Sequence, residues 1–334
     1  MYKYLSLIRY YNLIFVVFVQ IMIRQTVLIP VLQKYGFEIA PFDLATWLLI
    51  LATVLIAAGG YVLNDYFDVK IDAINQPEKQ IVNKTVSKSV AMRLYQVLTG
   101  AGVVSGLASA HFSQSYTLAF IYVVVPGLLW FYSASYKRQF LTGNLAVSFV
   151  AALTVLVMAI NEVKLLENEY GDLLYQTPLP SELYAWTAGF ALFSFLLTLI
   201  REIIKDIEDI EGDREMECRT IPIVWGIKKA KIVIYSLIII TLAALFALNH
   251  FYINFEGSLT FRYMLFGVAL PLVVLAIMIF SAHERQSLHQ ASTLAKYIML
   301  TGVLYGFVFY YLMAKTYQFS LFGLFMIDAG NQIR

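Results

Sequence analysis

Six aspartates form two clusters that repeat one spacing about 140 residues apart. The first cluster lies in the stretch YVLNDYFDVKID, and the second lies in LIREIIKDIEDIEGD. In each stretch the second aspartate follows the first by three residues, and the third follows the second by four. The six residues are Asp65, Asp68, Asp72, Asp206, Asp209 and Asp213. Carboxylates without nearby thiolates or imidazoles favour hard cations such as Mg²⁺ or Ca²⁺, so the pattern predicts a divalent metal site.

Basic residues accompany both clusters, which indicates an anion as a second ligand. They are Lys79, Lys84, Lys88, Lys137, Arg138, Arg201 and Lys205. Mg²⁺ usually takes one or two carboxylates and completes its shell with water and phosphate oxygens. On a helix the spacing would place each cluster within an arc of about 60°, as one stripe of carboxylates. Two facing stripes would repel by several kcal/mol per pair, so we expect metal ions and a diphosphate between them.

The elements that must position these clusters are apolar segments long enough to cross a bilayer. The chain has 334 residues, of which 60% are hydrophobic and 14% are charged, and this composition indicates a membrane protein. Continuously apolar runs of about 20 residues predict helices rather than a β-barrel. We expect nine transmembrane helices, at 12–32, 45–63, 91–110, 115–132, 142–161, 184–203, 230–250, 261–281 and 294–315.

These helices predict an all-α polytopic fold, a bundle around a central cavity that opens to the cytoplasmic side. We expect residues 1–334 to form a single membrane domain, because no linker-like segment divides the chain. Each aspartate cluster follows the second helix of a four-helix set, and a ninth helix is left over. This arrangement predicts a faint parallel repeat with both clusters on the same side of the membrane.

Charge distribution predicts which side that is. Most Lys and Arg residues fall in the N-terminal tail and in or beside the loops after helices 2, 4, 6 and 8, whereas the stretch NEVKLLENEYGDLLYQTPLPSE is acidic. The positive-inside rule therefore places the N-terminus and both clusters on the cytoplasmic face of the inner (cytoplasmic) membrane.

Three other readings of the clusters are less consistent with the sequence. A solvated helix end would explain one cluster but not its duplication, nor Asn64 and Arg201 at the membrane boundary. An EF-hand loop fails because Gly212 comes too early after Asp209 and no closing glutamate follows. A cation transporter would place its acids near the middle of the membrane.

With these two motifs the chain resembles the UbiA-type intramembrane prenyltransferase superfamily. NDYFDVKID fits the pattern NDxxDxxxD, and KDIEDIEGD fits DxxDxxxD. The resemblance extends to LIRYYNL, YSASYKRQFLTGN and RTIPIVWGIKKA, and so covers essentially the whole chain. It implies a nine-helix enzyme that uses Mg²⁺ to bind an isoprenyl diphosphate and transfers the prenyl group to an acceptor.

The resemblance also implies roles for individual residues. All six aspartates would surround the Mg²⁺–diphosphate, with Asp68 and Asp209 essential for catalysis and Tyr132 near the reacting carbon. The diphosphate oxygens would meet Asn64, Lys79, Lys137, Arg201 and Lys205, and Asn12 would lie on the acceptor side. Where many relatives carry an Arg-Pro pair after the first motif, this chain has Lys79 and Gln80, and lysine lacks the bidentate fork of arginine.

Three functions are consistent with these residues. The form REIIKDIEDIEGD and the chain length resemble geranylgeranylglycerol-phosphate geranylgeranyltransferase-like members, which use a lipid acceptor. The alternative is an aromatic prenyltransferase of quinone biosynthesis, acting on 4-hydroxybenzoate or dihydroxynaphthoate. A membrane carrier or cation-binding protein without chemistry is the third. No nucleic acid or obligate protein partner is expected, and the residues assign no general base.

Arg24 lies roughly 18 Å into the first helix, at 1.5 Å per residue. It would line the cavity and meet an anionic acceptor, or it would pair with an acid such as Glu162 or reach the far surface.

Overall fold

The computed structural model describes residues 2–37, 42–75, 77–253 and 255–327, and its regular elements are helices. Within these ranges nine helical segments are long and apolar enough to cross a membrane, which confirms the predicted number. They are Tyr10–Lys34, Leu44–Phe67, Lys88–Phe112, Tyr116–Ala134, Thr142–Gln176, Leu179–Glu208, Ile227–Phe251, Leu259–Ser281 and Arg285–Tyr317. The protein is therefore an integral membrane protein.

Six of the spans consist of one helix each: α4 (Leu44–Phe67), α6 (Lys88–Phe112), α7 (Tyr116–Ala134), α9 (Leu179–Glu208), α12 (Ile227–Phe251) and α15 (Arg285–Tyr317). The other three combine α2 (Tyr10–Ile23), η1 (Arg24–Leu28) and α3 (Ile29–Lys34), then α8 (Thr142–Tyr170) and η4 (Gly171–Gln176), then α13 (Leu259–Tyr263), η5 (Met264–Ala269) and α14 (Leu270–Ser281). Helix α1 (Tyr2–Leu7) precedes the first span. Short helices connect later spans: α5 (Val69–Asn75), η2 (Pro77–Lys79), η3 (Tyr136–Arg138), α10 (Ile210–Glu215) and α11 (Ile221–Val224).

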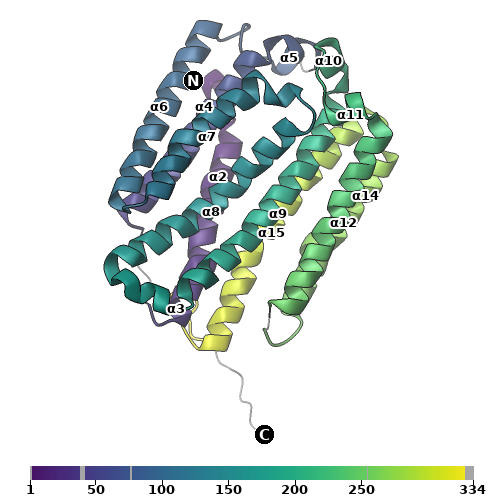
Figure 1. The fold of residues 1–334 in the computed structure, drawn as a ribbon. Coiled ribbons are helices and arrows are strands. Elements are labelled where there is room, and N and C mark those ends of the chain that lie inside the picture. Colours follow the sequence, from purple (N-terminus) through teal and green to yellow (C-terminus); the bar gives the residue numbers. More distant parts are fainter. Residues whose placement is uncertain (1, 38–41, 76, 254, 328–334) are drawn as a thin grey trace.

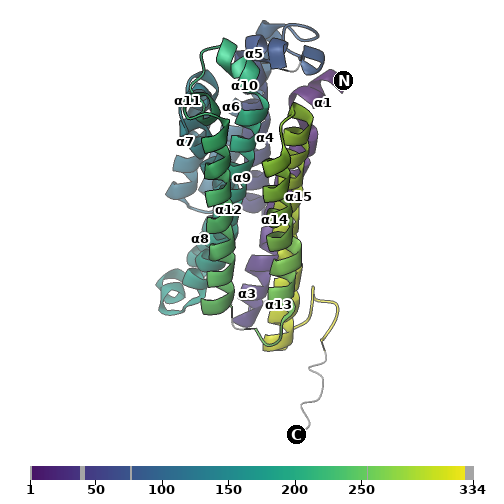
Figure 2. The same ribbon diagram turned by 90° about the vertical axis from the view of Figure 1, so that its right-hand side faces the viewer.

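The long helices run roughly parallel or antiparallel to one another and form one bundle (Figure 1). The short helices α5, α10 and α11 lie together at one end of it, which we call the aspartate end, and α3 and α13 lie at the opposite, distal end (Figure 2). Both aspartate motifs are thus at the same end of the bundle.

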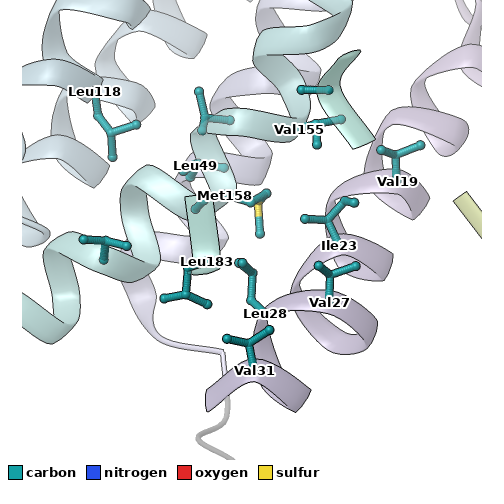
Figure 3. Packing of buried hydrophobic residues seen from close by; sticks show 14 of the residues in the cluster. Val19, Ile23, Val27, Leu28, Val31, Leu49, Leu118, Val155, Met158 and Leu183 are labelled. Atoms are coloured by element: carbon teal, nitrogen blue, oxygen red, sulfur yellow. The ribbon is translucent and has the colours of Figure 1, made fainter. Parts of the chain in front are cut away.

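Two apolar clusters hold the bundle together. In the first, Val19, Ile23 and Val27 of the N-terminal span pack near Leu49 of α4 and Met158 of α8 (Figure 3). The second cluster joins α9, α12, α14 and α15 through buried residues that include Ile200, Ile234, Leu272 and Ile298. Because lipid tails are as apolar as these side chains, close packing rather than escape from water drives helix association here.

Helices α4 and α6 approach each other closely because small residues line their interface. A Cβ on Gly102 would lie 2.8 Å from Ile56 Cγ1, so only glycine permits this approach. The hydroxyls of Ser105 and Ser109 donate hydrogen bonds to the carbonyls of Leu48 and Ala45 across the interface, at 2.9 and 2.8 Å. These contacts fix α4, the helix that carries Asp65, the first aspartate of the first motif.

Arg24 forms a buried ion pair, which decides between the alternatives for this residue. Its Nε donates to Glu162 Oε2 at 3.2 Å, and its guanidinium lies 4.6 Å from the centroid of the Phe42 ring. The side chain is 2% exposed and joins the N-terminal span to α8. Arg24 therefore neutralises an intramembrane acid and does not line the central cavity described below.

Two helices extend well beyond their predicted apolar runs. Helix α8 continues nine residues past 161 to Tyr170, and α15 begins nine residues before 294, at Arg285. The added segment of α8, EVKLLENEY, contains three Glu and two Leu, which favour helix, and the added segment of α15, RQSLHQAST, is mostly polar. Hydropathy marks the part of a helix that lies in lipid, and helical hydrogen bonding continues past it.

Candidate active site

The two aspartate motifs break their helices in the same way. Helix α4 ends at Phe67 and α9 ends at Glu208, so Asp68 and Asp209 each follow a helix end. Their backbone angles are similar, with φ −87° and ψ 2° at Asp68 and φ −100° and ψ 11° at Asp209. A single carboxylate stripe would need a continuous helix through each motif, but each long helix ends before the middle aspartate, and the third aspartate lies on a separate short helix, α5 or α10.

This break lets the two motifs meet, because the short helices can approach each other independently of α4 and α9. Asn75 of α5 donates from Nδ2 to the carbonyl of Asp209 at 3.1 Å and accepts from the Gly212 amide of α10 at 3.0 Å. Gly212 has to be a glycine, since an added Cβ would lie 2.5 Å from Asn75 Nδ2. Arg285 of α15 donates to the Asn75 carbonyl and, at 3.0 Å, to Asp209 Oδ1.

Lys137 places a positive charge among the aspartates. Its ammonium forms an ion pair with Asp68, which is 2% exposed, and lies 3.5 Å from Asn64 Oδ1. Burial, the largest single influence, lowers the pKa of Lys137, but the neighbouring Asp68, Tyr132 and Asp72 together raise that pKa above its ordinary value. The lysine therefore stays charged and holds one carboxylate of the first motif.

The carboxylates on the short helices have perturbed acidity. Burial raises the pKa of Asp72 to about 7, and the Asp68 charge adds to this. Burial likewise raises the pKa of Asp213 to about 6, although Lys137 acts in the opposite direction. Both shifts come first from burial, which disfavours the ionised carboxylate, and a divalent cation bound there would stabilise the ionised form.

The carboxylates of the site suit Mg²⁺ that is coordinated partly by phosphate better than they suit a metal ion coordinated by protein side chains alone. Among the residues that the structure describes, no three acidic, histidine or cysteine side chains gather closely enough to hold an ion by themselves. Mg²⁺ keeps several waters and binds through one or two carboxylates together with substrate phosphates. The described carboxylates therefore fit an ion that a diphosphate helps to coordinate.

A cavity of about 1260 Å³ begins among these residues and continues into the bundle. Ten of the predicted site residues line it: Asn12, Asn64, Asp72, Tyr132, Lys137, Arg201, Lys205, Asp206, Asp209 and Asp213. Asp65 and Asp68 lie behind this lining, where they pair with Arg9 and Lys137. The side chain of Lys79 lies outside the described residues. The cavity extends to Trp186 and Tyr305, so the polar end opens into a long, largely apolar space.

Comparison with known proteins decides the family. A family model described as the UbiA prenyltransferase family matches residues 27–300, which is most of the chain. The chain belongs to the UbiA prenyltransferase family. The resemblance of the aspartate motifs is thereby confirmed, and the protein is a prenyltransferase.

The relatives of this prenyltransferase include two digeranylgeranylglyceryl phosphate synthases. That of Ignicoccus hospitalis is 36% identical over 171 residues, which is 51% of this chain and 51% of that protein. That of Methanothermobacter thermautotrophicus is 31% identical over 256 residues, which is 76% of this chain and 81% of that protein. The second alignment spans most of both chains.

Two solved structures share the UbiA fold with this prenyltransferase. One comes from a study of digeranylgeranylglyceryl phosphate synthase in membranes, with a TM-score of 0.58 and 22% identity, and covers 94% of this chain and 98% of the other. The second is a UbiA homolog from Archaeoglobus fulgidus bound to DMAPP and Mg²⁺, with a TM-score of 0.57, 16% identity and coverage of 93% and 99%. At these identities the likeness shows a common fold.

Three polar partners in the site of this prenyltransferase had no role assigned from the sequence. Arg9 pairs with Asp65 at 2.8 Å, and Asn144 Nδ2 donates to Asp206 Oδ2 at 2.8 Å. Glu202 accepts from Arg201 at 2.5 Å. All three lie in stretches that carry the family resemblance, and this position is the sequence signal that could have identified them as site residues. The first two pairings join distant parts of the chain, so spacing could not reveal them.

We expect Asn75→Ala to lower kcat about 10- to 100-fold. The substitution removes both hydrogen bonds of the Asn75 side chain to the second motif, and misplacement of catalytic groups by about 1 Å can cost on the order of 10²-fold. Steady-state rates of the purified variant, with its melting temperature, measure this effect. Gln286→Ala, which removes an exposed amide from the same end of the bundle, is the control. Unchanged kcat in Asn75→Ala would show that this contact does not position the motifs.

Proposed function

We propose that this prenyltransferase transfers a prenyl group from an isoprenyl diphosphate to a geranylgeranylglyceryl phosphate-like acceptor, using Mg²⁺. The observation that carries the proposal is the meeting of both aspartate motifs, through Asn75 and Gly212, at the polar end of a long cavity. The names of the sequence relatives support the acceptor. The A. fulgidus homolog structures, with DMAPP or GPP and Mg²⁺, support the donor and the metal.

In this proposal the six aspartates and their basic neighbours hold the diphosphate. Mg²⁺ bound there would neutralise the carboxylates and the charge that develops on the leaving diphosphate. Lys137, Arg201 and Lys205 line the same end of the cavity and add fixed positive charge. Asn64, beside Lys137, can orient a phosphate oxygen or the lysine itself. We propose Lys79 as a further phosphate contact on its position after the first motif.

The body of the cavity suits the prenyl chain and the cation that forms when the diphosphate leaves. Its walls include the apolar residues Val19, Ile23, Phe190, Phe193, Leu197 and Val268. Such walls exclude water, which would otherwise capture an allylic cation. Tyr132 lines the cavity and interacts with the charges of Lys137, Asp68 and Asp206, so its ring lies beside the diphosphate site. There the ring face can stabilise the developing positive charge.

We further propose that the aspartate end faces the cytoplasm. The loops at this end contain most of the lysines and arginines, whereas the stretch 161–182, in which acids outnumber bases, lies toward the distal end. The protein would then receive both substrates from the cytoplasmic leaflet or the cytosol. Residues 1–334 would act as one membrane domain, with the lipid bilayer as their surroundings.

A panel of acceptors tests the proposed function. The purified protein is incubated with geranylgeranyl diphosphate and geranylgeranylglyceryl phosphate, 4-hydroxybenzoate or dihydroxynaphthoate, with Mg²⁺ and with a chelator. We expect Mg²⁺-dependent release of diphosphate and, by mass spectrometry, a prenylated product with the glyceryl phosphate only. A product with an aromatic acceptor instead would move the protein to quinone-type chemistry. Absence of diphosphate release with every acceptor would contradict prenyl transfer.

A further inference from the structure

The cavity divides into two branches in the distal half of the bundle, where α9 and α15 contact each other directly. The rings of Trp186 and Phe309 have centroids 4.3 Å apart, and those of Phe190 and Tyr305 are 6.3 Å apart. These two helices lie in the middle of the bundle, with α2 and α8 on one side and α12 and α14 on the other (Figure 1). Residues from both sides line the cavity, so it passes on both sides of this contact.

The inner branch lies between α2, α4, α7 and α8. Its lining includes Val19, Ile23, Gly60, Leu129, Ala151 and Val155. The branch ends where Val19, Ile23 and Val155 join the packed cluster around Met158 (Figure 3). Its other end adjoins the diphosphate site, because α4 also carries Asn64 and α7 also carries Tyr132. The inner branch is therefore a closed apolar space that begins beside the reacting centre.

The outer branch lies between α9, α12 and η5. Its lining includes Ala185, Gly189, Leu192, Leu245, Leu248 and Met264. On α9 the first three are spaced by four and three residues and so share one face, about 100° from the face that carries Trp186 and Phe190. Ala185 is exposed and Leu192 is 44% exposed within this membrane span. The outer branch therefore opens sideways to lipid.

Gly189 shows that the protein leaves the outer branch unfilled. Glycine in the middle of a helix is destabilising relative to alanine, so it usually needs a packing reason. At Gly59 that reason is present, because an added Cβ would lie 2.3 Å from Thr99 Oγ1. At Gly189, in the interior of α9, an added Cβ would meet no protein atom within 4 Å. Protein packing does not require this glycine, whereas a ligand in the branch would make use of the space.

We infer that the outer branch holds the lipid chain of the acceptor, while the inner branch holds the prenyl chain of the donor. The inference rests on the proposed function, in which both substrates carry long isoprenoid chains. A volume of about 1260 Å³ exceeds the range of about 300–1,000 Å³ that suits one drug-sized ligand. The closed inner branch suits the donor, whose cation has to be shielded from water. An aromatic acceptor has no chain to fill the outer branch.

The length of the outer branch agrees with this assignment. Gly189 precedes Arg201 by 12 residues, which is about 18 Å along α9 at 1.5 Å per residue. A lipid chain of one leaflet covers about 15 Å, half of the ~30 Å hydrocarbon core. An acceptor with its head group beside Arg201 would therefore extend its chain as far as Gly189. Beyond that point the open side lets the chain continue into lipid.

Gly189→Phe tests the outer branch by filling it. We expect kcat/KM for geranylgeranylglyceryl phosphate to fall about 10- to 100-fold, because an excluded chain displaces the reacting hydroxyl and a shift of about 1 Å can cost on the order of 10²-fold. With dimethylallylglyceryl phosphate, whose chain is too short to reach Gly189, the fall should be less than about threefold, and KM for geranylgeranyl diphosphate should change less than about twofold. Gly100→Phe, at an exposed glycine outside the cavity with nothing within 4 Å, is the matched control.

Ala151→Phe fills the inner branch and should give the opposite pattern. Its kcat/KM should fall about 10- to 100-fold with geranylgeranyl diphosphate, because the displaced chain misplaces the reacting carbon. With dimethylallyl diphosphate, which does not reach Ala151, the fall should be less than about threefold. If Gly189→Phe affects both acceptors equally, or weakens the donor instead, the inference is wrong. Unchanged kinetics in Gly189→Phe would show that membrane lipid alone occupies the outer branch.

Photo-cross-linking of the wild type gives an answer that does not depend on the folding of any variant. A diazirine is placed at the chain end of each substrate, and each probe is bound separately in the presence of Mg²⁺. The acceptor probe should label peptides of α12 and η5, and the donor probe should label peptides of α2 and α8. Reversed labelling, or labelling of one branch by both probes, would overturn the inference. If the wild type does not prenylate geranylgeranylglyceryl phosphate at all, the proposed function itself fails, which is a separate result.

Discussion

Asp68→Ala and Asp209→Ala are each expected to lower prenyl transfer by about 10³-fold or more while leaving the protein folded. Asp68 is the nearly buried carboxylate that pairs with Lys137, and Asp209 is joined to Asn75 and Arg285. Both residues lie where a long helix ends and a short helix follows. Each substitution therefore removes one half of the proposed metal site. Diphosphate release by the purified variants at saturating Mg²⁺ measures the loss.

Folding of these variants is assessed separately from their activity. The melting temperatures of both should stay within a few degrees of the wild type, because the two positions lie outside the transmembrane cores and contact polar groups. Asp172→Ala, a substitution of an exposed aspartate in η4, provides a matched control that should retain full activity. If both site variants are folded and active, the aspartate motifs do not form the site.

Lys137→Gln has the second largest expected effect, a fall in kcat of about 10²- to 10³-fold. The lysine is the positive charge that interacts most directly with the motif aspartates, and its raised pKa shows that it stays charged in this setting. Removal of one preorganised group that stabilises developing charge usually costs this much. Rates at saturating concentrations of both substrates provide the measurement.

The neighbouring residue gives the control for this prediction. Arg138→Gln removes a positive charge from the same short helix, η3, but Arg138 forms no ion pair with a described acid. It should keep kcat within about threefold of the wild type. Lys137→Arg should recover part of the activity, because the charge returns with a wider and more rigid head group. Equal losses in Lys137→Gln and Arg138→Gln would indicate a general charge effect.

The transmembrane helices could be predicted because their signal is local. An apolar run of about 20 residues is sufficient for a helix in lipid, where backbone hydrogen bonds must be satisfied within the segment. The polar extension of α8 to Tyr170 and the early start of α15 at Arg285 were missed. Water can solvate a helix or a loop there, and only neighbouring structure selects between them.

The candidate site could be predicted in composition but not in geometry. The spacing of the aspartates identified both motifs, yet neither Pro nor Gly marks the breaks at Asp68 and Asp209. The contact of Asn75 with Gly212 joins residues 137 positions apart. Packing of α5 against α10 creates this contact, and no pattern within a single segment encodes it. The ion pair of Arg24 with Glu162 also joins residues far apart in the chain, so the structure was needed to distinguish it from the other roles predicted for Arg24.

Binding of geranylgeranyl diphosphate, measured by isothermal titration calorimetry with and without Mg²⁺, tests the central claim most directly. The claim is that both aspartate motifs together hold one metal-bound diphosphate. Wild type should bind the diphosphate tightly only with Mg²⁺, and Asp68→Ala and Asp209→Ala should each lose that binding. Tight binding without Mg²⁺, or unchanged Mg²⁺-dependent binding in either variant, would contradict the claim.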